Sequence, residues 1–132
     1  MLAVARLFEV MPRRALPWVV AATVGLVPTL VMAHHSFALF DQTKTVAVKG
    51  VVGRYEWTNP HVAVYIDVPG PTPQRLKVET GSVNALSRQG WKATDIKVGD
   101  KAEVTFHPLK SGDPGGLLIE IKTDSIVLKG GG

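Results

Sequence analysis

The chain has 132 residues, enough for one domain, and its 15 Lys and Arg residues outnumber its 11 Asp and Glu residues. Beyond residue 33 the balance narrows to twelve basic and ten acidic residues, which excludes the concentrated positive charge of a nucleic-acid-binding protein. The chain has no cysteine, which excludes a disulfide scaffold, Cys-ligated zinc, an iron–sulfur cluster and a thiol nucleophile.

Residues 1–33 have the three parts of a secretory signal peptide. Three arginines lie within residues 1–14, residues 15–31 carry no charge, and Val31-Met32-Ala33 is a small-residue cleavage site. We expect cleavage after Ala33, which makes His34 the first residue of a bacterial protein that is periplasmic or secreted and is not attached to the membrane. A retained membrane anchor is the alternative, but the 17-residue uncharged run is short for a span of about 20 residues, and two prolines and a glycine interrupt it.

The rest of the chain divides into an N-terminal extension (34–42), a β-rich domain (43–129) and a flexible glycine tail (130–132). Gly50 and Gly53 predict bends in a long first strand. Alternating apolar and polar residues predict five strands, which cover residues 43–57, 61–68, 75–79, 101–107 and 117–128.

One short helix is expected, over residues 83–88, with Ser82 as its N-cap and Gly90 beyond its end. Three strands, a helix and two strands follow the order of the OB-fold. We therefore predict an all-β fold with one short helix, a five-stranded OB-like barrel. A two-sheet sandwich is the alternative, and the barrel is favoured because five short strands would otherwise leave open edges.

The alternation also predicts which side chains point into the core. In the last strand the inward row is expected to be Leu117, Ile119 and Ile121. The other expected core residues are Val62, Val64, Ile66, Leu76, Val78, Val104 and Phe106.

Several sequence blocks resemble a family of small exported bacterial proteins of uncharacterised function. The more specific ones are the His34-His35-Ser36-Phe37 opening and Trp57-Thr58-Asn59-Pro60-His61. The others are Phe40-Asp41, Glu79-Thr80-Gly81-Ser82, Asn84-Ala85-Leu86, Gly90-Trp91, Gly99-Asp100 and His107-Pro108-Leu109-Lys110. The resemblance implies export and a compact β domain, and it implies no mechanism.

The four histidines, His34, His35, His61 and His107, are the candidate metal ligands. Imidazole nitrogens suit copper and zinc, and cleavage after Ala33 would let the α-amine and ring of His34 chelate one ion together. His107 is preferred over His61 as the further ligand, because the fourth strand should end near the start of the first, while His61 is expected about 20 Å away at the far end. Residues 37–42 could close that gap by folding back, and His61 could instead bond within its turn.

A non-metal ligand site is the alternative, on the barrel face that OB-folds use for binding. Its candidate residues are Trp57, Asn59, Tyr65, Glu79, Asn84 and Trp91. The alternative, which is favoured, is that the aromatic residues pack under the turn and the helix as part of a small core. Glu79 could cap the helix or pair with Arg54 or Arg75.

The sequence thus predicts an exported binding protein for a copper or zinc ion, or else for a small ligand or a periplasmic protein partner. No Walker-type phosphate loop, nucleophile elbow or His-Glu-x-x-His helix is present, which favours binding over catalysis. A copper-dependent redox enzyme is the third alternative.

Overall fold

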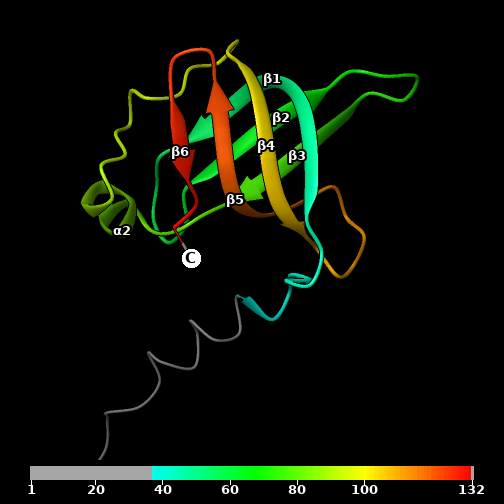
Figure 1. Cartoon of the computed structure of the whole chain (residues 1–132), viewed down its shortest axis with the longest axis horizontal. Coiled ribbons are helices and arrows are strands. Elements are labelled where there is room, and N and C mark those ends of the chain that lie inside the picture. Colours follow the sequence, from blue (N-terminus) through cyan, green and yellow to red (C-terminus); the bar gives the residue numbers. More distant parts are fainter. Residues whose placement is uncertain (1–36, 132) are drawn as a thin grey trace, which may run out of the picture.

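A computed structural model describes residues 37–131, which contain one short helix and six strands (Figure 1). The predicted signal peptide, His34 and His35 lie outside the described residues. Within residues 37–131, no helix is both long enough and apolar enough to cross a membrane. In chain order the elements are β1 (Val46–Glu56), β2 (Ala63–Val68), β3 (Gln74–Glu79), α2 (Val83–Arg88), β4 (Lys101–Pro108), β5 (Gly115–Thr123) and β6 (Val127–Lys129).

The first five strands form a closed barrel. β1 pairs with both β2 and β4, β2 pairs with β3, and β4 pairs with β5, all antiparallel. A short parallel pairing of β3 with β5, from Lys77–Gly115 to Glu79–Leu117, closes the ring. The predicted five-stranded OB-like barrel is therefore confirmed, and the sandwich is not what forms.

The predicted last strand is divided in two, which the alternation did not reveal. The chain reverses after Thr123, whose hydroxyl accepts hydrogen bonds from the backbone N–H groups of Ser125 and Ile126. β6 then pairs back onto β5 as an extra strand. The Thr123 hydroxyl thus supplies the hydrogen-bond acceptor for the backbone N–H groups of this turn. The strand that was expected to run on to Leu128 therefore ends at Thr123.

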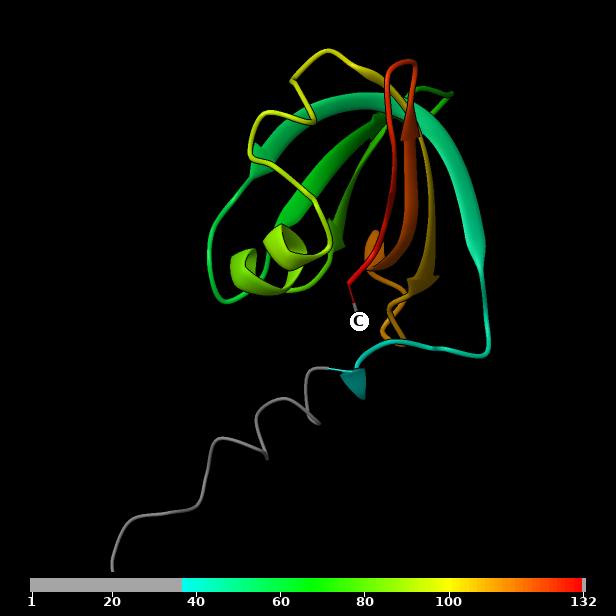
Figure 2. The same ribbon diagram turned by 60° about the vertical axis from the view of Figure 1, so that its left-hand side comes forward.

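β1 is bent into an arch at its two glycines. A Cβ on Gly50 would overlap the backbone oxygen of Asp67, and the pairing register with β2 shifts at Gly53, between Val52 and Arg54. The start of β1 pairs with β4 and its end pairs with β2. As a result, the start of β1 and the loop after its end both lie toward the lower end of the barrel in Figure 2.

The core fills the barrel as predicted, except along β5. Phe106 lies opposite Leu118 and Thr105 lies opposite Glu120, so Ile119 is the extra residue of a β-bulge. The bulge shifts the alternation, and the inward row is Leu118 and Ile121. The prediction of Leu117 and Ile119 as inward residues is therefore wrong. The fully buried side chains are Val52, Val62, Val64, Ile66, Val78, Leu86, Val104 and Ile121.

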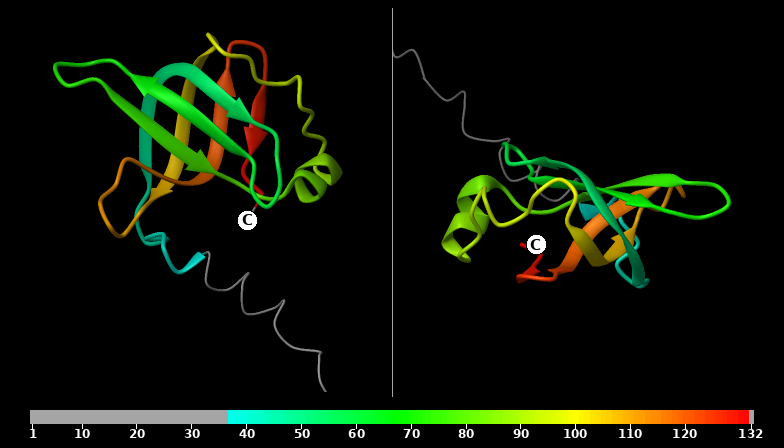
Figure 3. Two further views of the ribbon diagram at one scale, coloured as in Figure 1. Left: turned by 180° about the vertical axis from the view of Figure 1, so that it is seen from behind. Right: turned by 90° about the horizontal axis from the view of Figure 1, so that it is seen from above.

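α2 has the predicted bounds, because its signals are local. The Ser82 hydroxyl accepts from the N–H of Ala85, and Gly90 follows the helix with φ of 93°. Leu86 is its one buried residue. The helix lies to one side of the barrel and the β2–β3 hairpin projects on the other (Figure 3).

The predicted flexible tail is hydrogen-bonded in its first two residues. Gly130 donates to the carbonyl of Ile119 at 2.7 Å, and Gly131 donates to the hydroxyl of Thr80 at 2.9 Å. A Cβ on Gly130 would overlap the Leu118 oxygen, so this close approach requires glycine. The first two residues of the predicted flexible tail thus make hydrogen bonds to the barrel, and Gly132 lies outside the described residues.

Candidate functional site

The N-terminal segment folds back onto the end of β4. The N–H of Asp41 donates to the carbonyl of Pro108 at 2.8 Å, and the N–H of Lys110 donates to the carbonyl of Leu39 at 2.9 Å. Between them Phe40 is only 5% exposed. The segment thus packs on the barrel. This agrees with the possibility, raised from the sequence, that residues 37–42 fold back.

A groove of about 190 Å³ lies between this segment and the barrel, and we call it the N-terminal groove. It gathers residues from five parts of the chain: the N-terminal segment, the loop after β1, the end of β3 with the residues that lead to α2, the start of β5 and the C-terminal tail. Its lining residues are Phe37, Phe40, Pro60, His61, Glu79, Thr80, Gly81, Ser82, Leu117 and Gly131. Three of the blocks on which the family resemblance rests therefore meet here, together with the last residue of a fourth.

The two described histidines are at the same end of the barrel. His61 is exposed and lines the N-terminal groove. His107 is half-buried and lies opposite Leu117 on the neighbouring strand, so both side chains project from the same face. Leu117 also lines the groove. The arch of β1 brings the loop with His61 to the end of the barrel where β1 begins and β4 ends, so the expected placement of His61 at the opposite end is wrong, while the expected distance of about 20 Å stays a prediction.

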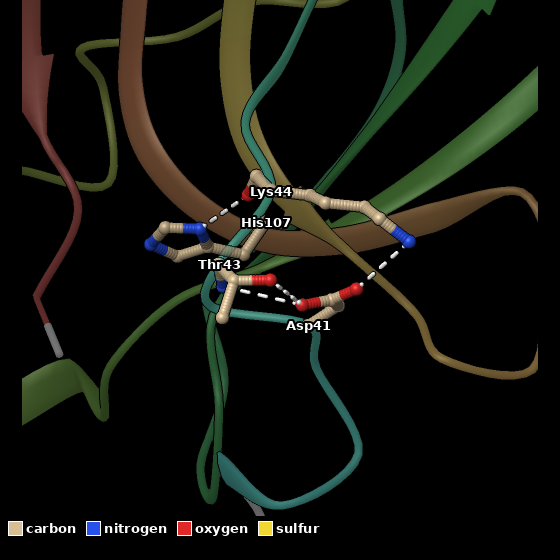
Figure 4. A network of polar contacts seen from close by, with 4 residues as sticks. All are labelled: Asp41, Thr43, Lys44 and His107. Atoms are coloured by element: carbon tan, nitrogen blue, oxygen red, sulfur yellow. Dashed lines mark hydrogen bonds and ion pairs between the residues drawn. The ribbon is translucent and has the colours of Figure 1, made fainter.

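The ring of His107 is held by the turn that leads into β1 (Figure 4). Its Nδ1 lies 2.7 Å from the carbonyl oxygen of Lys44. In that turn the Asp41 carboxylate accepts from the Thr43 hydroxyl at 2.6 Å and pairs with the Lys44 ammonium at 3.0 Å. The Thr43 hydroxyl, followed by Lys44, lowers the pKa of Asp41 to about 2, so the carboxylate stays ionised near neutral pH.

The described residues alone supply no complete metal site. Among residues 37–131, no three His, Asp or Glu side chains lie close enough together to hold a metal ion. The other two candidate ligands, His34 and His35, lie outside the described residues. A metal site at this end of the barrel therefore requires them.

Glu79 is in the N-terminal groove, but neither of its expected partners is there. Its carboxylate pairs with Lys77 Nζ at 2.5 Å and raises the pKa of that ammonium. The expected partners are taken by other acids: Arg75 pairs with Asp67 and Arg54 with Glu56. The helix cap is Ser82 instead. The expected cap or Arg pair for Glu79 is wrong because same-face neighbours two residues apart on β3 meet first.

The other candidates for a non-metal site do not gather around one hollow. Tyr65 lies on the outer barrel face, with Arg54 over its ring and its hydroxyl donating to Glu56 at 3.2 Å. Trp57 packs against the core, with its ring centre 6.1 Å from that of Tyr55. In the described chain, the ring of Tyr65 thus contacts the Arg54 guanidinium, and the ring of Trp57 packs against Tyr55 and the core.

Trp91, Asn59 and Asn84 have different surroundings. Trp91 is 3% exposed and its indole N–H donates to the carbonyl of Lys129, so no ligand can lie on its ring. Asn59 accepts from the N–H of Val83 at the start of α2. Asn84 is exposed on the helix. Of the six candidates, only Glu79 lines the N-terminal groove.

The sequence reasoning missed the apolar side of the groove. Phe37, Phe40 and Leu117 line it, and none was a candidate site residue. The two phenylalanines belong to the resemblance blocks, which was a usable signal. Leu117 gave none, because its place outside the barrel depends on the bulge in β5.

A wider hollow of about 410 Å³ lies near Gly50 and Lys101, where β1 bends. Its ten lining residues include no histidine and no aromatic residue. It therefore offers no imidazole ligand and no aromatic ring, and its charged side chains are Lys49, Lys101, Glu103, Lys122 and Asp124.

A comparison with protein families gives one match. The sequence model of the family of unknown function DUF6152 matches residues 23–120. The chain belongs to this family. No curated protein matches the chain. Membership agrees with the expected family of uncharacterised function. That the quoted sequence blocks are motifs of this family, and that the protein is exported, stay predictions. The DUF6152 match spans β1 to β4, most of β5 and every groove residue except Gly131, and it assigns no activity.

Proposed function

We propose that this protein is exported, is cleaved after Ala33, and binds a copper or zinc ion between its new N-terminus and the N-terminal groove. One observation carries the proposal: Phe37, the first described residue, lines the same groove as His61. Because the N-terminal histidines directly precede Phe37 in the chain, this position supports a site that they share with His61.

The tether is short enough to decide where these histidines can reach. His35 is two residues before Phe37 and His34 is three, so their Cα atoms lie within about 7 Å and about 11 Å of that of Phe37. His61 is in the groove and His107 flanks Leu117 beside it. Ligands from both parts of the chain can therefore approach one ion.

The proposed donor atoms suit a metal ion of intermediate softness. A free α-amine and several neutral imidazoles are nitrogen ligands, which copper(II) and zinc(II) prefer. Glu79 on the groove wall can balance the charge of the ion. The buried ring of Phe40 on the groove wall reduces the access of water to an ion beside it.

Groove size favours a metal ion over a larger ligand. Sites for drug-sized molecules usually measure roughly 300–1,000 Å³. The N-terminal groove measures about 190 Å³, and its walls include three bulky apolar side chains. A bare ion with its ligands fits this space better than an organic ligand does.

The test is a copper(II) titration, measured by calorimetry, of the protein purified from the periplasm. We expect one equivalent to bind the processed protein, and much weaker binding when one extra Gly precedes His34, because the amine then leaves the chelate. His61→Ala should also weaken binding, while Asn84→Ala, exposed and away from the groove, should leave it unchanged. Equal affinity with and without the extra Gly would rule out the terminal chelate.

Export has a separate test. N-terminal sequencing and intact-mass measurement of the periplasmic fraction should give a chain that starts at His34. Recovery of the full-length chain from the membrane fraction would instead support a retained anchor.

A further inference from the structure

We propose that a trough on the outer face of β1 binds an amphiphile that has an apolar alkyl chain and a carboxylate head. The chain lies on Val51, and the ammonium groups of Lys101 and Lys122 bind the head. All three residues line the hollow where β1 bends. The proposal is separate from the metal-binding function and shares no residue with it.

The trough consists of two adjoining hollows. The hollow of about 410 Å³ near Gly50 and a second one of about 520 Å³, at the base of the projecting β2–β3 hairpin, share Val51 and Pro69 (Figure 3). We call the two together the β1 trough. Each volume lies within the range of roughly 300–1,000 Å³ that is usual for small-molecule sites. The trough is therefore large enough for an organic ligand.

The middle of the β1 trough is apolar and open to solvent. Val51 is 41% exposed, although it lies in the interior of an 11-residue strand. Val68, Pro69 and Pro73 extend this apolar surface toward the hairpin. An alkyl chain that covers Val51 removes apolar surface of both partners from water, which favours binding.

The form of the β1 trough favours a linear chain over a planar ring. No aromatic side chain lines either hollow, so no aromatic residue is there to stack on a ring. Arg75 is on β3 and Lys122 is on β5, so the trough crosses five neighbouring strands, roughly 19 Å at about 4.8 Å between strands. An extended alkyl chain matches this length, and its burial requires no directional contact.

The hairpin end of the β1 trough offers no free cation. The Arg75 guanidinium donates to both carboxylate oxygens of Asp67, at 2.6 and 2.8 Å. This ion pair raises the pKa of Arg75 and lowers that of Asp67, so both groups stay charged near neutral pH. The head of the ligand is therefore expected at the other end.

That other end has lysines in excess. Lys49 pairs with Glu103 at 3.5 Å, while the ion pairs found in residues 37–131 include neither Lys101 nor Lys122. Lys101 lies directly opposite Val51 on β4, and Lys122 lies opposite Glu103 on β5. Asp124 is the remaining acid of this hollow. Two exposed ammonium groups thus lie next to the apolar floor, where they are able to donate hydrogen bonds to a carboxylate.

Dodecanoate, kept below its micelle concentration, tests the site in the purified protein without added metal. The methyl NMR signals of Val51 should shift during the titration, whereas those of Val98, which is 69% exposed and lines neither hollow, should not. Dodecyltrimethylammonium has the same chain and the opposite charge, and it should bind at least about fivefold more weakly. Unshifted Val51 signals, or equal affinity for the two amphiphiles, would overturn the proposal.

Variants of the lysines test the binding of the head. The double variant Lys101→Gln and Lys122→Gln should lower dodecanoate affinity by about 3–10-fold and reduce its dependence on salt. The double variant Lys92→Gln and Lys110→Gln is the matched control, because both lysines are exposed and neither lines the trough. Equal affinities of the two double variants would show that the head does not bind at Lys101 and Lys122.

A variant of the floor tests the binding of the chain. Val51→Ala should weaken dodecanoate binding by about 3–10-fold, because methyl groups that the chain covers are lost. Its urea midpoint checks that the fold is kept, and Val98→Ala is the control at an exposed valine outside the trough. Unchanged affinity in a folded Val51→Ala variant would rule out the proposed floor.

Vesicles of phosphatidylglycerol separate a small-ligand site from a membrane contact. If the protein sediments with these vesicles while monomeric dodecanoate leaves Val51 unshifted, the face contacts membranes and the proposal is wrong. Because the metal titration involves other residues, failure of this proposal leaves the proposed metal-binding function standing, and the reverse also holds.

Discussion

Asn59 accepts a hydrogen bond from the backbone N–H of Val83, with 3.0 Å between Oδ1 and N, and so joins the loop after β1 to the first turn of α2. The next two residues of that loop, Pro60 and His61, line the N-terminal groove. The position of His61 thus depends on a contact between segments 24 residues apart.

Asn59→Ala should lower the free energy of unfolding by about 0.5–2 kcal/mol, because the N–H at the start of α2 loses its acceptor. Urea unfolding of the purified domain measures it. Asn84→Ala is the control: Asn84 is exposed on the same helix, where alanine is the better helix former. Equal losses in the two variants would show that the Asn59 contact contributes nothing.

Gly50→Ala should destabilise the arch of β1 by about 1–3 kcal/mol. The new Cβ would overlap the Asp67 backbone oxygen and lie 2.7 Å from a methyl group of Ile66. At Gly70 a Cβ would meet no atom within 4 Å, so Gly70→Ala should change the urea midpoint little. The arch interpretation fails if the two alanine variants unfold at the same urea concentration.

Ile66→Ala should lower the free energy of unfolding by about 2–5 kcal/mol, since its side chain is fully buried at the centre of the barrel. Val51→Ala removes methyl groups from a side chain that is 41% exposed, and we expect a change within about 0.5 kcal/mol. Chemical denaturation of both variants provides the comparison. A loss below about 1 kcal/mol for Ile66→Ala would contradict the described core.

The domain should lose stability at alkaline pH through Tyr55. Burial, and then the charge of Asp95, raise its pKa above the ordinary value of 10.0, so the folded state favours the neutral phenol. That contribution is fully present below pH 10 and is lost as the pH rises further, because the unfolded chain ionises first.

Absorbance titration of the phenolate band follows the two tyrosines of the chain, and Tyr55→Phe should remove the later step. The same variant should reduce the loss of stability above pH 10. Ionisation of Tyr55 in the folded protein at its ordinary pKa would refute this.

The local elements could be predicted because their signals lie within a few residues. Ser82, the helix formers after it and Gly90 are sufficient for α2, and its bounds match those predicted. Strict alternation likewise located β2, where Val64 and Ile66 point inward. The strand order then led to the OB-like barrel.

Elements that depend on partners could not be predicted in detail. The bulge at Ile119 is defined by the pairing with β4, in which no residue lies opposite Ile119, and no residue type in β5 indicates it. Strict alternation therefore placed Leu117 in the core, although it lies on the outer face and lines the groove. The reversal after Thr123 was missed for the same reason.

The sequence by itself determined the candidate ligands, the expected cleavage site, the helix and the order of strands, because composition, spacing and capping are properties of neighbouring residues. Only the tertiary structure decided at which end of the barrel the described histidines lie. The bends at Gly50 and Gly53 carry the chain over the barrel and back, so that His61 and His107 lie at one end with the N-terminal segment between the barrel and solvent. That placement arises from pairings between residues far apart in the chain, whose loop-closure cost is offset only by the closed barrel as a whole.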